Sequence, residues 1–344
     1  MSSHSLHRRA TIRDVAAEAR VSTSTVSLYI RGDSRVSDDT GKKVAAAIAK
    51  LGYVPRSRRP SARRSSLVAL LVEDYSLLAF PDSIYGDLIH TIEAQARRAG
   101  LGMLLTVTGD DQAKRMLQEQ QVGGVIVLGG SPSNDALTCE LCDQGYPLVL
   151  ADNYVPGLFV DSILPDNYWG SYAAFQHLIQ LGHRRIAIIE GPRKYRTLTD
   201  RLKGALHAAE DAGISLPTEY RQPSISQGYP NKGYREMKRL LALSNRPTAV
   251  FAISDRAARG ALEAIKEAGF RVPDDISLVG FDDEAFAVHL VPSLTTVRFN
   301  MQRLGELAME QILKRMNGDQ SEPARINVYS PLVVRDSATL YETD

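Results

Sequence analysis

Cysteine is almost absent from this chain of 344 residues, which contains only Cys139 and Cys142. Two cysteines are too few for a disulfide framework, and such scarcity is typical of proteins that stay in a reducing compartment. Long apolar runs are missing too: none reaches the ~18 residues of a membrane-spanning helix, and the polar, basic amino terminus lacks the apolar stretch of a signal peptide. We therefore expect a cytoplasmic protein with no membrane partner.

The patterns that usually indicate an enzyme or a metal site are missing as well. The Gly-Gly-Ser run at 129–131 lacks the lysine of a phosphate-binding loop, and neither a nucleophile elbow nor a metal-binding pair of histidines occurs. Cys139 and Cys142 have the CxxC spacing, but they have no second cysteine pair and no nearby histidine. We expect no catalytic residue, no metal and no cofactor.

What the chain does contain is a strong charge asymmetry. Residues 1–66 hold fourteen Lys and Arg against five Asp and Glu, a net charge of +9, whereas the rest holds 27 basic and 35 acidic residues, a net charge of −8. This distribution indicates a small module that meets a polyanion, attached to a larger module that does not. A solvated basic tail is the alternative, and helical periodicity decides between the two.

Residues 11–51 show the periodicity of three short helices, each preceded by a capping residue. The caps and helices are Thr11 before residues 12–20, Ser22 before 23–30, and Ser37 before a helix from Asp38 to Leu51. The apolar faces expected to be buried are Ile12, Val15, Ala16 and Ala19 in the first helix, Val26 and Ile30 in the second, and Val44, Ala45, Ile48 and Leu51 in the third. A very short turn between two helices, with a small polar face on the second, predicts a helix-turn-helix rather than a bare helical bundle.

From Leu67 onward, short apolar runs alternate with amphipathic helices. The predicted strands are residues 67–72, 103–107, 125–128, 148–151, 186–189, 249–252 and 276–279, and the predicted helices include 88–99, 169–181, 198–212 and 256–268. Continuous apolar strands separated by helices indicate parallel sheets covered on both faces. Such sheets bind ligands beyond the carboxyl ends of their strands.

A family resemblance runs along about 330 of the 344 residues. TIRDVAAEARVSTSTVSLYIRG (11–32), RVSDDT (35–40) and LGYVP (51–55) resemble the DNA-binding head of the lactose-repressor, or LacI-type, bacterial transcription regulators. The motifs that resemble the family's effector domain, in the expected order, are DN (166–167), GSY (170–172), HLIQLGHRRIAII (177–189), RVPDDISLVGFDD (271–283), PSLTTVR (292–298) and SPLVVRDSAT (330–339). Many ordered motifs make this far stronger evidence than a lone helix-turn-helix.

The resemblance implies a small all-α head followed by an α/β body of the periplasmic-binding-protein type, with two parallel-sheet subdomains and a cleft between them. The expected domains are a DNA-binding domain at 1–55, a hinge linker at 56–66, and an effector-binding and dimerisation domain at 67–344, whose N-subdomain is about 67–165 with 293–328 and whose C-subdomain is about 166–292 with 329–344. The chain is expected to cross between subdomains near Asp166 and Pro292.

The function implied is that of an effector-responsive transcription regulator. We expect a repressor and homodimer that binds double-stranded operator DNA in the nucleoid and responds to a small molecule, a sugar or a related metabolite. Two alternatives share the body. A solute-binding protein needs an export signal and has no use for residues 11–51, and an α/β enzyme needs a catalytic constellation in the cleft. Whether the effector releases or recruits DNA stays open.

The second helix of the head is expected to enter the major groove while the first braces on phosphates. By resemblance, residues 23, 24 and 28 read bases, and Leu28 stands where relatives often carry Arg. Because Arg grips guanine and Leu contacts only a thymine methyl, we expect less guanine at that step. Arg20 stands where relatives favour Gly in the turn, so a left-handed Arg20 is expected to cost about 1 kcal/mol, and a shifted turn without strain is the alternative. The predicted DNA contacts are Thr11, Ser22, Thr23, Ser24, Thr25, Ser27, Leu28, Arg35, Tyr53, Arg56, Arg58, Arg59, Ala62 and Arg63.

The linker RSRRPSARRSS (56–66) departs from the family, where this segment folds into a hinge helix that inserts a Leu into the minor groove. Ala62 occupies the position of that Leu, and Pro60 disfavours a helix. The five arginines still suit phosphates or a narrow minor groove. We expect electrostatic contact with little kinking by intercalation, and a flexible tether is the alternative.

Two cleft residues carry over from the family most directly. Arg201, in RLKG (201–204), matches the effector-binding Arg, whose planar fork suits hydroxyls or a carboxylate. Asp282, in GFDD (280–283), matches an Asp that accepts hydrogen bonds from the ligand. The alternatives are a surface ion pair for Arg201 and a turn or cap for Asp282.

The other predicted effector contacts rest on weaker matches. They are Ser254 and Asp255, where relatives often have Asn-Asp; Tyr85 and Tyr229, near the aromatic walls of the family's pocket; and Asp152, which follows the strand at 148–151. Either tyrosine could instead belong to the core.

Overall fold

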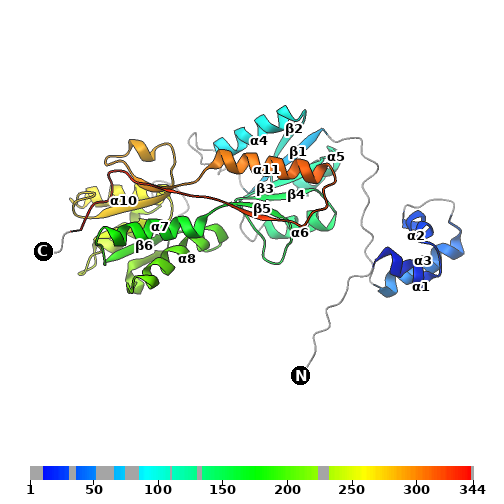
Figure 1. Cartoon of the computed structure of the whole chain (residues 1–344), viewed down its shortest axis with the longest axis horizontal. Coiled ribbons are helices and arrows are strands. Elements are labelled where there is room, and N and C mark those ends of the chain that lie inside the picture. The colour runs from blue at the N-terminus through cyan, green and yellow to red at the C-terminus, as the bar shows by residue number, and fades with distance from the viewer. Residues whose placement is uncertain are drawn as a thin grey trace, which may run out of the picture. The chain divides into compact units, whose positions relative to one another are not determined.

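The computed structural model describes residues 11–30, 36–51, 66–73, 85–108, 111–129, 134–223 and 232–341. The chain forms two compact units (Figure 1): a small one that contains helices α1–α3, and a large one that contains the other helices and the strands. Among the described residues, no helix is both long enough and apolar enough to cross a membrane.

Three helices make up the small unit: α1 (Ile12–Ala19), α2 (Thr23–Ile30) and α3 (Asp38–Leu51). Each begins after the capping residue that the sequence predicts. Thr11 and Asp14 form a capping box, in which the Asp14 carboxylate accepts a hydrogen bond from the Thr11 amide at 2.7 Å. The hydroxyl of Ser22 accepts from the amide three residues later at 3.0 Å, and that of Ser37 does the same at 3.4 Å. Local side-chain chemistry therefore sets where these helices begin.

The core of the small unit takes one fully buried valine from each helix, namely Val15, Val26 and Val44. Ala47 joins them, whereas Ala45, predicted for this core, is only partly buried. The correction follows from helix geometry. A residue three positions after Val44 lies on the same face, and the next residue lies about 100° around the axis.

The turn between α1 and α2 contains Arg20 in the left-handed conformation, with φ 54° and ψ 46°. This is the conformation expected at a position where glycine is easiest to accommodate. An Arg here costs about 1 kcal/mol relative to glycine.

The large unit contains two six-stranded sheets. The first has the order β11-β5-β4-β3-β1-β2, with β1 (Leu67–Val72), β2 (Gly102–Val107), β3 (Gly124–Leu128), β4 (Leu148–Ala151), β5 (Asp161–Pro165) and β11 (Arg325–Val328). The second has the order β12-β10-β9-β8-β6-β7, with β6 (Ile186–Glu190), β7 (Arg221–Pro223), β8 (Ala249–Ala252), β9 (Ser277–Asp282), β10 (Thr295–Arg298) and β12 (Leu332–Val333). Neighbouring strands are parallel except β10 and β12. Parallel pairing brings the carboxyl ends of the strands to one edge of each sheet.

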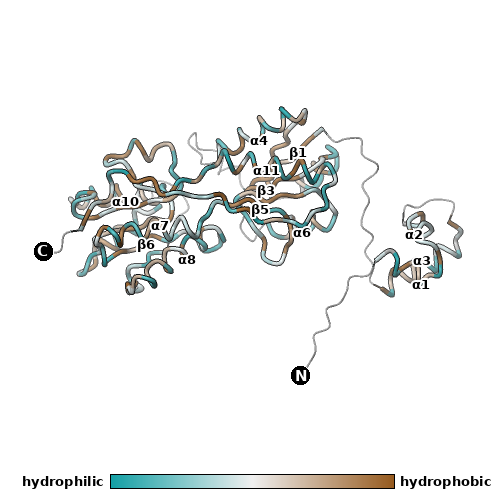
Figure 2. Tube along the Cα trace, viewed as in Figure 1, coloured by the Kyte–Doolittle hydropathy of each residue, from teal (hydrophilic) through white to brown (hydrophobic). Residues whose placement is uncertain are grey.

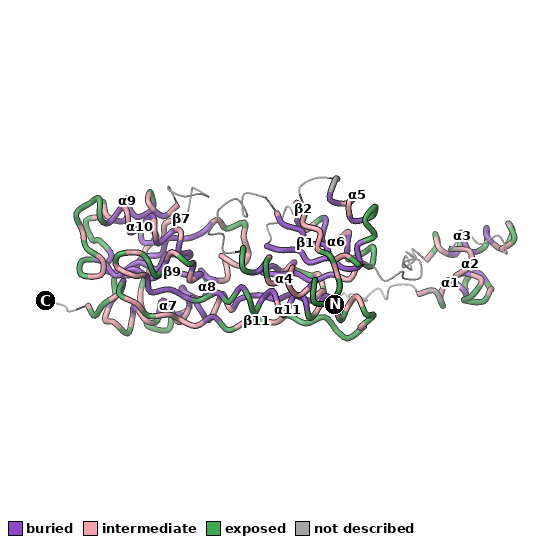
Figure 3. Tube along the Cα trace, turned by 90° about the horizontal axis from the view of Figure 1, so that it is seen from above, coloured by how far each residue is buried: buried purple, intermediate pink, exposed green. Residues whose placement is uncertain are grey.

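Each sheet is covered by helices on both faces, as continuous apolar strands predict. On the first sheet, α4 (Gly86–Arg98) and α11 (Met301–Met316) pack against one face, and α5 (Asp111–Glu119) and α6 (Asp135–Asp143) against the other. On the second sheet, the pairs are α7 (Asn167–Gln180) with α8 (Arg196–Asp211), and α9 (Tyr234–Leu241) with α10 (Asp255–Glu267). Two 3-10 turns, Thr218–Tyr220 and Ala287–His289, belong to the same half of the large unit as the second sheet. The strands are the apolar, buried interior (Figures 2 and 3).

All seven predicted strands are present, with ends shifted by three residues at most. The strands β5, β7, β10, β11 and β12 were not predicted. They are two to five residues long, and the strands at the sheet edges lack an apolar run: β11, for example, alternates exposed Arg325 and Asn327 with partly buried residues. Such short segments form because a neighbouring strand offers hydrogen bonds, which the local sequence does not reveal.

The second crossing between subdomains lies later than predicted. The chain leaves the first sheet after β5 and enters α7 at Asp166, close to the expected place. It was expected to return near Pro292, but β10 pairs with β9 through Arg298, so residues 293–298 belong to the second subdomain. The return therefore occurs at Phe299 and Asn300, directly before α11.

Candidate DNA-binding and effector-binding sites

The candidate DNA-binding surface is the first half of α2. Thr23 and Ser24 in its first turn are exposed, and Ser27 and Leu28, one turn later, are partly buried. The exposed amides and hydroxyls at a helix amino terminus suit phosphate oxygens and base edges. The exposed pair therefore lies where the sequence predicts base contacts.

Three other predicted DNA contacts have internal partners. Thr11 belongs to the capping box of α1. Ser22 and Thr25 share a hydrogen bond of 2.8 Å between their hydroxyls at the start of α2. These hydroxyls stabilise the two helices that present the surface, and the Ser22 and Thr25 side chains remain at least partly accessible.

Several predicted contacts lie outside the described residues. They are Arg35, Tyr53, Arg56, Arg58, Arg59, Ala62 and Arg63 in the amino-terminal part, and Tyr229 among the effector contacts. The hinge at 56–66 lies outside them too, except for Ser66.

Arg201 is the centre of the candidate effector site. It lies on α8 with 3% of its surface exposed, and its Nε donates to Asn167 Oδ1 at 2.8 Å. Its Nη1 donates to the carbonyl of Ile253 at 3.0 Å and to Asp282 Oδ1 at 2.7 Å, and its guanidinium carbon lies 3.7 Å from the centre of the Phe281 ring. Among the described residues, Nη2 and Asp282 Oδ2 have no hydrogen-bond partner. One donor and one acceptor are therefore left for a ligand.

Two carboxylates of the site sit on strained backbone. Asp282 ends β9 with φ 125°, and Asp152 follows β4 with φ 48°. Both are conformations that side chains other than glycine rarely adopt, at roughly 1–3 kcal/mol each. Such strain is typical of functional sites because the surrounding fold holds the side chain in place.

Asp152 forms the opposite part of the site. It is 5% exposed, and its Oδ2 accepts from the Tyr85 hydroxyl at 2.7 Å, while Oδ1 is buried without a hydrogen-bond partner among the described residues. Burial raises the pKa of Asp152 to about 6; Asp282 adds to the rise, and Arg201 and the Tyr85 hydrogen bond oppose it. Burial also raises the pKa of Tyr85, so its hydroxyl stays a donor.

Asp255 and Ser254 have internal roles at the start of α10. Asp255 is fully buried; its Oδ2 accepts from the Glu284 amide at 2.9 Å and its Oδ1 from the Thr296 hydroxyl at 2.5 Å. Ser254 caps α10 by accepting from the Ala257 amide at 3.3 Å. Asp255 therefore connects the start of α10 to β10 and to the segment after β9, whereas Ser254 serves as the cap of α10.

Two family descriptions match the chain. Residues 11–56 match "Bacterial regulatory proteins, lacI family", and residues 175–338 match "Periplasmic binding protein-like domain". The chain is 33% identical over 335 residues to the HTH-type transcriptional repressor PurR of Mannheimia succiniciproducens, and the alignment covers 95% of this chain and 98% of that protein. The chain belongs to the lacI family of bacterial regulatory proteins.

Solved structures of similar proteins agree with this lacI-family assignment. A complex of the transcriptional regulator CelR with cellobiose has a TM-score of 0.73 and 33% identity, and covers 96% of this chain and 100% of that one. The lac repressor dimer bound to operator and the anti-inducer ONPF has a TM-score of 0.71 and 25% identity, with the same coverage. These findings confirm the predicted fold class and a DNA-binding regulator with an effector domain. The PurR relative is a repressor by name, which confirms the expectation of a regulator rather than an enzyme.

Asn167 is a residue of this lacI-family site that sequence reasoning missed. It lies buried in the first turn of α7, where its side chain accepts from Arg201 and donates to the carbonyl of Pro165 at 3.3 Å. It belongs to the DN motif at 166–167, so the sequence showed the motif but not that Asn167 bonds to Arg201. The contact spans 34 positions and depends on how α7 packs on α8.

A second set of side chains joins the two subdomains, and we call it the subdomain latch: Arg196, Asp135, Tyr154 and Asp200. Arg196, the first residue of α8, makes a bidentate ion pair with Asp135, the first residue of α6, and donates to the Tyr154 carbonyl at 3.1 Å. The Tyr154 hydroxyl donates to Asp200 Oδ2 at 2.8 Å. Burial, followed by the Asp200 hydrogen bond, raises the pKa of Tyr154 to about 12.

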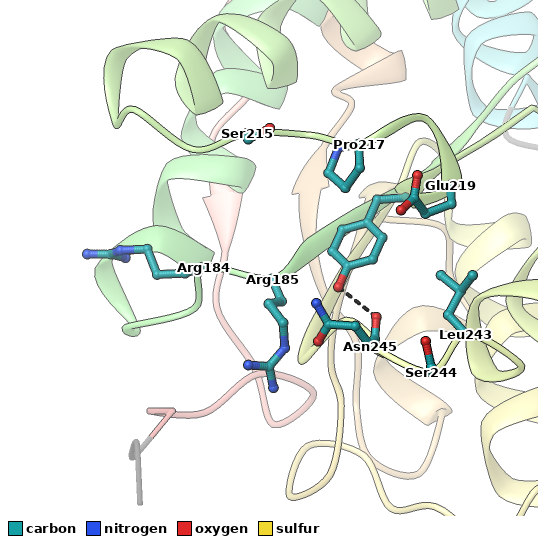
Figure 4. Close-up of a pocket in the computed structure, with 9 residues that line it drawn as sticks. Arg184, Arg185, Ser215, Pro217, Glu219, Leu243, Ser244 and Asn245 are labelled. Carbon is teal, nitrogen blue, oxygen red and sulfur yellow. Dashed lines mark hydrogen bonds between the residues drawn. The ribbon is translucent and has the colours of Figure 1, made fainter.

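Cavities lie at both ends of β6 in the second subdomain. One of about 180 Å³ lies at the carboxyl end of β6 beside Glu190, which pairs with Arg193 at 3.2 Å and Arg221 at 2.8 Å. The other, about 240 Å³, lies at the amino ends of β6 and β8, where the Tyr220 hydroxyl donates to the Asn245 carbonyl at 2.8 Å (Figure 4). That second cavity is at the sheet edge opposite the effector residues and is therefore separate from them.

The remaining conspicuous residues have structural surroundings. His183 is buried between the Thr248 hydroxyl at 2.9 Å and the Thr339 carbonyl at 3.2 Å, and burial lowers its pKa to about 4. Trp169 lies in the first turn of α7 and is 55% exposed. Cys139 and Cys142 lie on α6 and form no disulfide bond. The described residues contain no group of three or more His, Cys, Asp or Glu that could hold a metal ion.

Proposed function

We propose that this lacI-family protein is a homodimeric repressor that acts on nucleoid DNA in the cytoplasm. Each head contacts one half of a pseudo-palindromic operator through α2, and a small polar metabolite in the body changes operator affinity. The PurR relative, a repressor by name, supports the regulatory role. The lac repressor, solved as a dimer on its operator, supports the assembly and the DNA partner.

The observation that carries the effector role is the set of polar atoms left without partners at the carboxyl ends of β4 and β9. Arg201 Nη2 offers a donor, and Asp282 Oδ2 and Asp152 Oδ1 offer acceptors. Asp152 Oδ1 is buried, and buried polar groups normally have partners; a ligand with several hydroxyls supplies that partner and reaches the other two atoms as well. The effector is a sugar or a related metabolite, and the cellobiose complex of CelR supports that class.

The residues divide into those that contact the effector and those that hold them. Tyr85, Asp152, Arg201 and Asp282 contact the ligand. Asp255 holds β10 and the segment after β9 behind Asp282, and Ser254 caps α10, since their side chains are engaged internally.

Effector and operator are coupled because the site draws on both subdomains. Asp152 comes from the first subdomain, and Arg201 and Asp282 come from the second. A ligand that contacts both sets favours one arrangement of the subdomains, and its effect on operator affinity must equal the effect of operator on ligand affinity.

The test starts from operators selected out of a random duplex library. Fluorescence anisotropy of the full chain is expected to show tight, salt-dependent association, and a thermal-shift screen of sugars, nucleosides and amino acids is expected to find an effector that changes it. A ligand at ~100 times its Kd adds about 2.7 kcal/mol of stability. Absence of salt-dependent binding to any duplex contradicts the proposal. Ligand binding without DNA binding favours a solute-binding protein, and ligand turnover favours an enzyme.

The base preference at Leu28 gives a sharper test of the head. Leu28→Arg introduces a side chain that bonds to guanine N7 and O6, worth about 1–3 kcal/mol of discrimination. Selection with this variant is expected to enrich guanine at one step of each half-site and leave the other positions unchanged. An unchanged preference at every position refutes the role of residue 28, and Lys50→Arg on α3 serves as the control substitution.

A further inference from the structure

Lys232 lies at the effector site, although nothing in the sequence singles it out. It precedes α9 in a tight backbone contact with α10: a Cβ on Gly260 would come within 2.2 Å of the Lys232 carbonyl oxygen, and one on Gly233 within 1.9 Å of the Ala257 carbonyl oxygen. These glycines let the two segments touch. Because α10 starts at the carboxyl end of β8, the contact places Lys232 beside the strand ends that carry the site.

The charges around Lys232 are paired with one another and not with it. Asp282 pairs with Arg201 at 2.7 Å, and Glu284 makes a bidentate pair with Arg256 at 3.0–3.2 Å. All four groups interact electrostatically with Lys232, yet within the described residues its ammonium makes no hydrogen bond or ion pair. Lys232 is therefore a cation beside two ion pairs, Arg201 with Asp282 and Arg256 with Glu284.

The carboxyl of Asp255, which interacts with Asp282, does not supply the missing negative charge. Both oxygens of Asp255 accept hydrogen bonds from Thr296 and Glu284. Burial, reinforced by Asp282, raises its pKa well above the usual value. Of the five charged groups here, the Lys232 ammonium is thus the one without an opposite partner among the described residues, and a partly buried cation in that position favours a ligand of opposite sign.

We propose that Lys232 determines effector specificity and that the effector carries an acidic group, a carboxylate or a phosphate, which pairs with the Lys232 ammonium while its hydroxyls bond to Arg201 and Asp282. This inference rests on the proposed effector site, and it narrows the ligand from polar metabolites in general to acidic ones.

A proton-linked signature accompanies this pairing. Burial lowers the pKa of Lys232; Arg256 and Arg201 act in the same direction, and Asp282 and Glu284 oppose them. An acidic ligand raises that pKa again, so binding at alkaline pH takes up a proton. Calorimetry at pH 8.5 in two buffers of different ionisation enthalpy is expected to detect this uptake with the wild-type chain and not with Lys232→Met.

The decisive experiment uses matched probes: glucose, glucuronate and glucose 6-phosphate; ribose and ribose 5-phosphate; and inorganic phosphate alone. Thermal shift and calorimetry are run on the full chain, on Lys232→Met, on Lys232→Arg, and on Lys266→Met as a control on an exposed lysine of α10. We expect an acidic probe to bind the wild type and Lys266→Met at least tenfold more tightly than its neutral partner. Lys232→Met is expected to lose this preference, and Lys232→Arg to retain part of it.

Two results overturn the inference. In one, a neutral probe binds as tightly as its acidic partner. In the other, phosphate and the acidic probes stabilise Lys232→Met as much as the wild type, including the case in which they stabilise neither. Operator binding by the same preparations distinguishes failure of this inference from failure of the proposed function. If operator binding persists, only the role of Lys232 fails. If operator binding is absent, the proposed function fails.

Discussion

The two subdomains contribute very different surroundings to the proposed effector site. In the second, Arg201 is held by Asn167, Ile253 and Asp282 before any ligand arrives. In the first, Asp152 has one hydrogen bond, from Tyr85, and a buried oxygen with no partner among the described residues. The ligand-facing side chain of the second subdomain is thus held in place before binding, while the first subdomain has a carboxylate oxygen that lacks a hydrogen-bond donor. A ligand gains orientation from the former and satisfies the latter.

The largest expected effect comes from breaking the preorganised side. Arg201→Met leaves the buried carboxylate of Asp282 and the amide of Asn167 without their partner. We expect a loss of about 3–5 kcal/mol in the free energy of unfolding, together with loss of the effector response. Urea unfolding measures the first and thermal shift with effector the second. Arg303→Met, on an exposed arginine of α11, is the control, and a loss below about 1 kcal/mol would show that this side is not held by Arg201.

The opposite behaviour is expected on the first subdomain. Asp152→Asn removes a buried charge but keeps an oxygen for the Tyr85 hydroxyl, so the variant is expected to be more stable and to bind effector less well. The pKa of Asp152 is raised in the folded protein to about 6, so ionisation costs stability above that pH, and the cost disappears as the pH falls below the unfolded value. The gain is therefore about 3 kcal/mol at pH 7.5 and vanishes toward pH 3.5.

Melting temperatures of wild type and Asp152→Asn between pH 4 and pH 8 test this sign. A gain in stability that is constant across the pH range, or larger in acid, contradicts the conclusion that ionised Asp152 destabilises the folded protein. Asp135→Asn provides a matched control because its carboxylate already pairs with Arg196.

The smallest effect concerns the subdomain latch, which connects the two sides. A double-mutant cycle with Arg196→Met and Asp135→Asn is expected to give a coupling of about 1 kcal/mol, since the pair is only partly buried. Each single variant should also release effector faster, because the arrangement that surrounds the ligand loses a contact. A cycle without coupling, with unchanged effector dissociation, would mean that the two sides act independently of the latch.

The sequence predicted most of what depends on neighbouring residues. Thr11, Ser22 and Ser37 cap the helices that they were expected to cap, and Arg20 adopts the left-handed turn. Each feature involves groups a few positions apart, so the local pattern contains both partners. The apolar strands were equally visible, because a strand buried on both faces needs a continuous apolar run.

The contacts between distant residues could not be predicted in this way. β10 was placed in the wrong subdomain because TTVR gives no sign of which sheet will pair with it. Arg201 was found through its motif, but Asn167 and Lys232 were not, since their roles depend on side chains 24 or more positions away. Ser254 and Asp255 matched a family pattern, yet their atoms serve the start of α10 and the strand ends.

By itself, the sequence determined that a basic three-helix head precedes a larger α/β body, because charge, capping and periodicity act over short distances along the chain. Only the tertiary structure decided which polar atoms near Arg201, Asp152 and Lys232 remain without a partner. Pairing of buried charges is settled by distances between strand ends and helix starts, and those distances exist only once the sheets have formed.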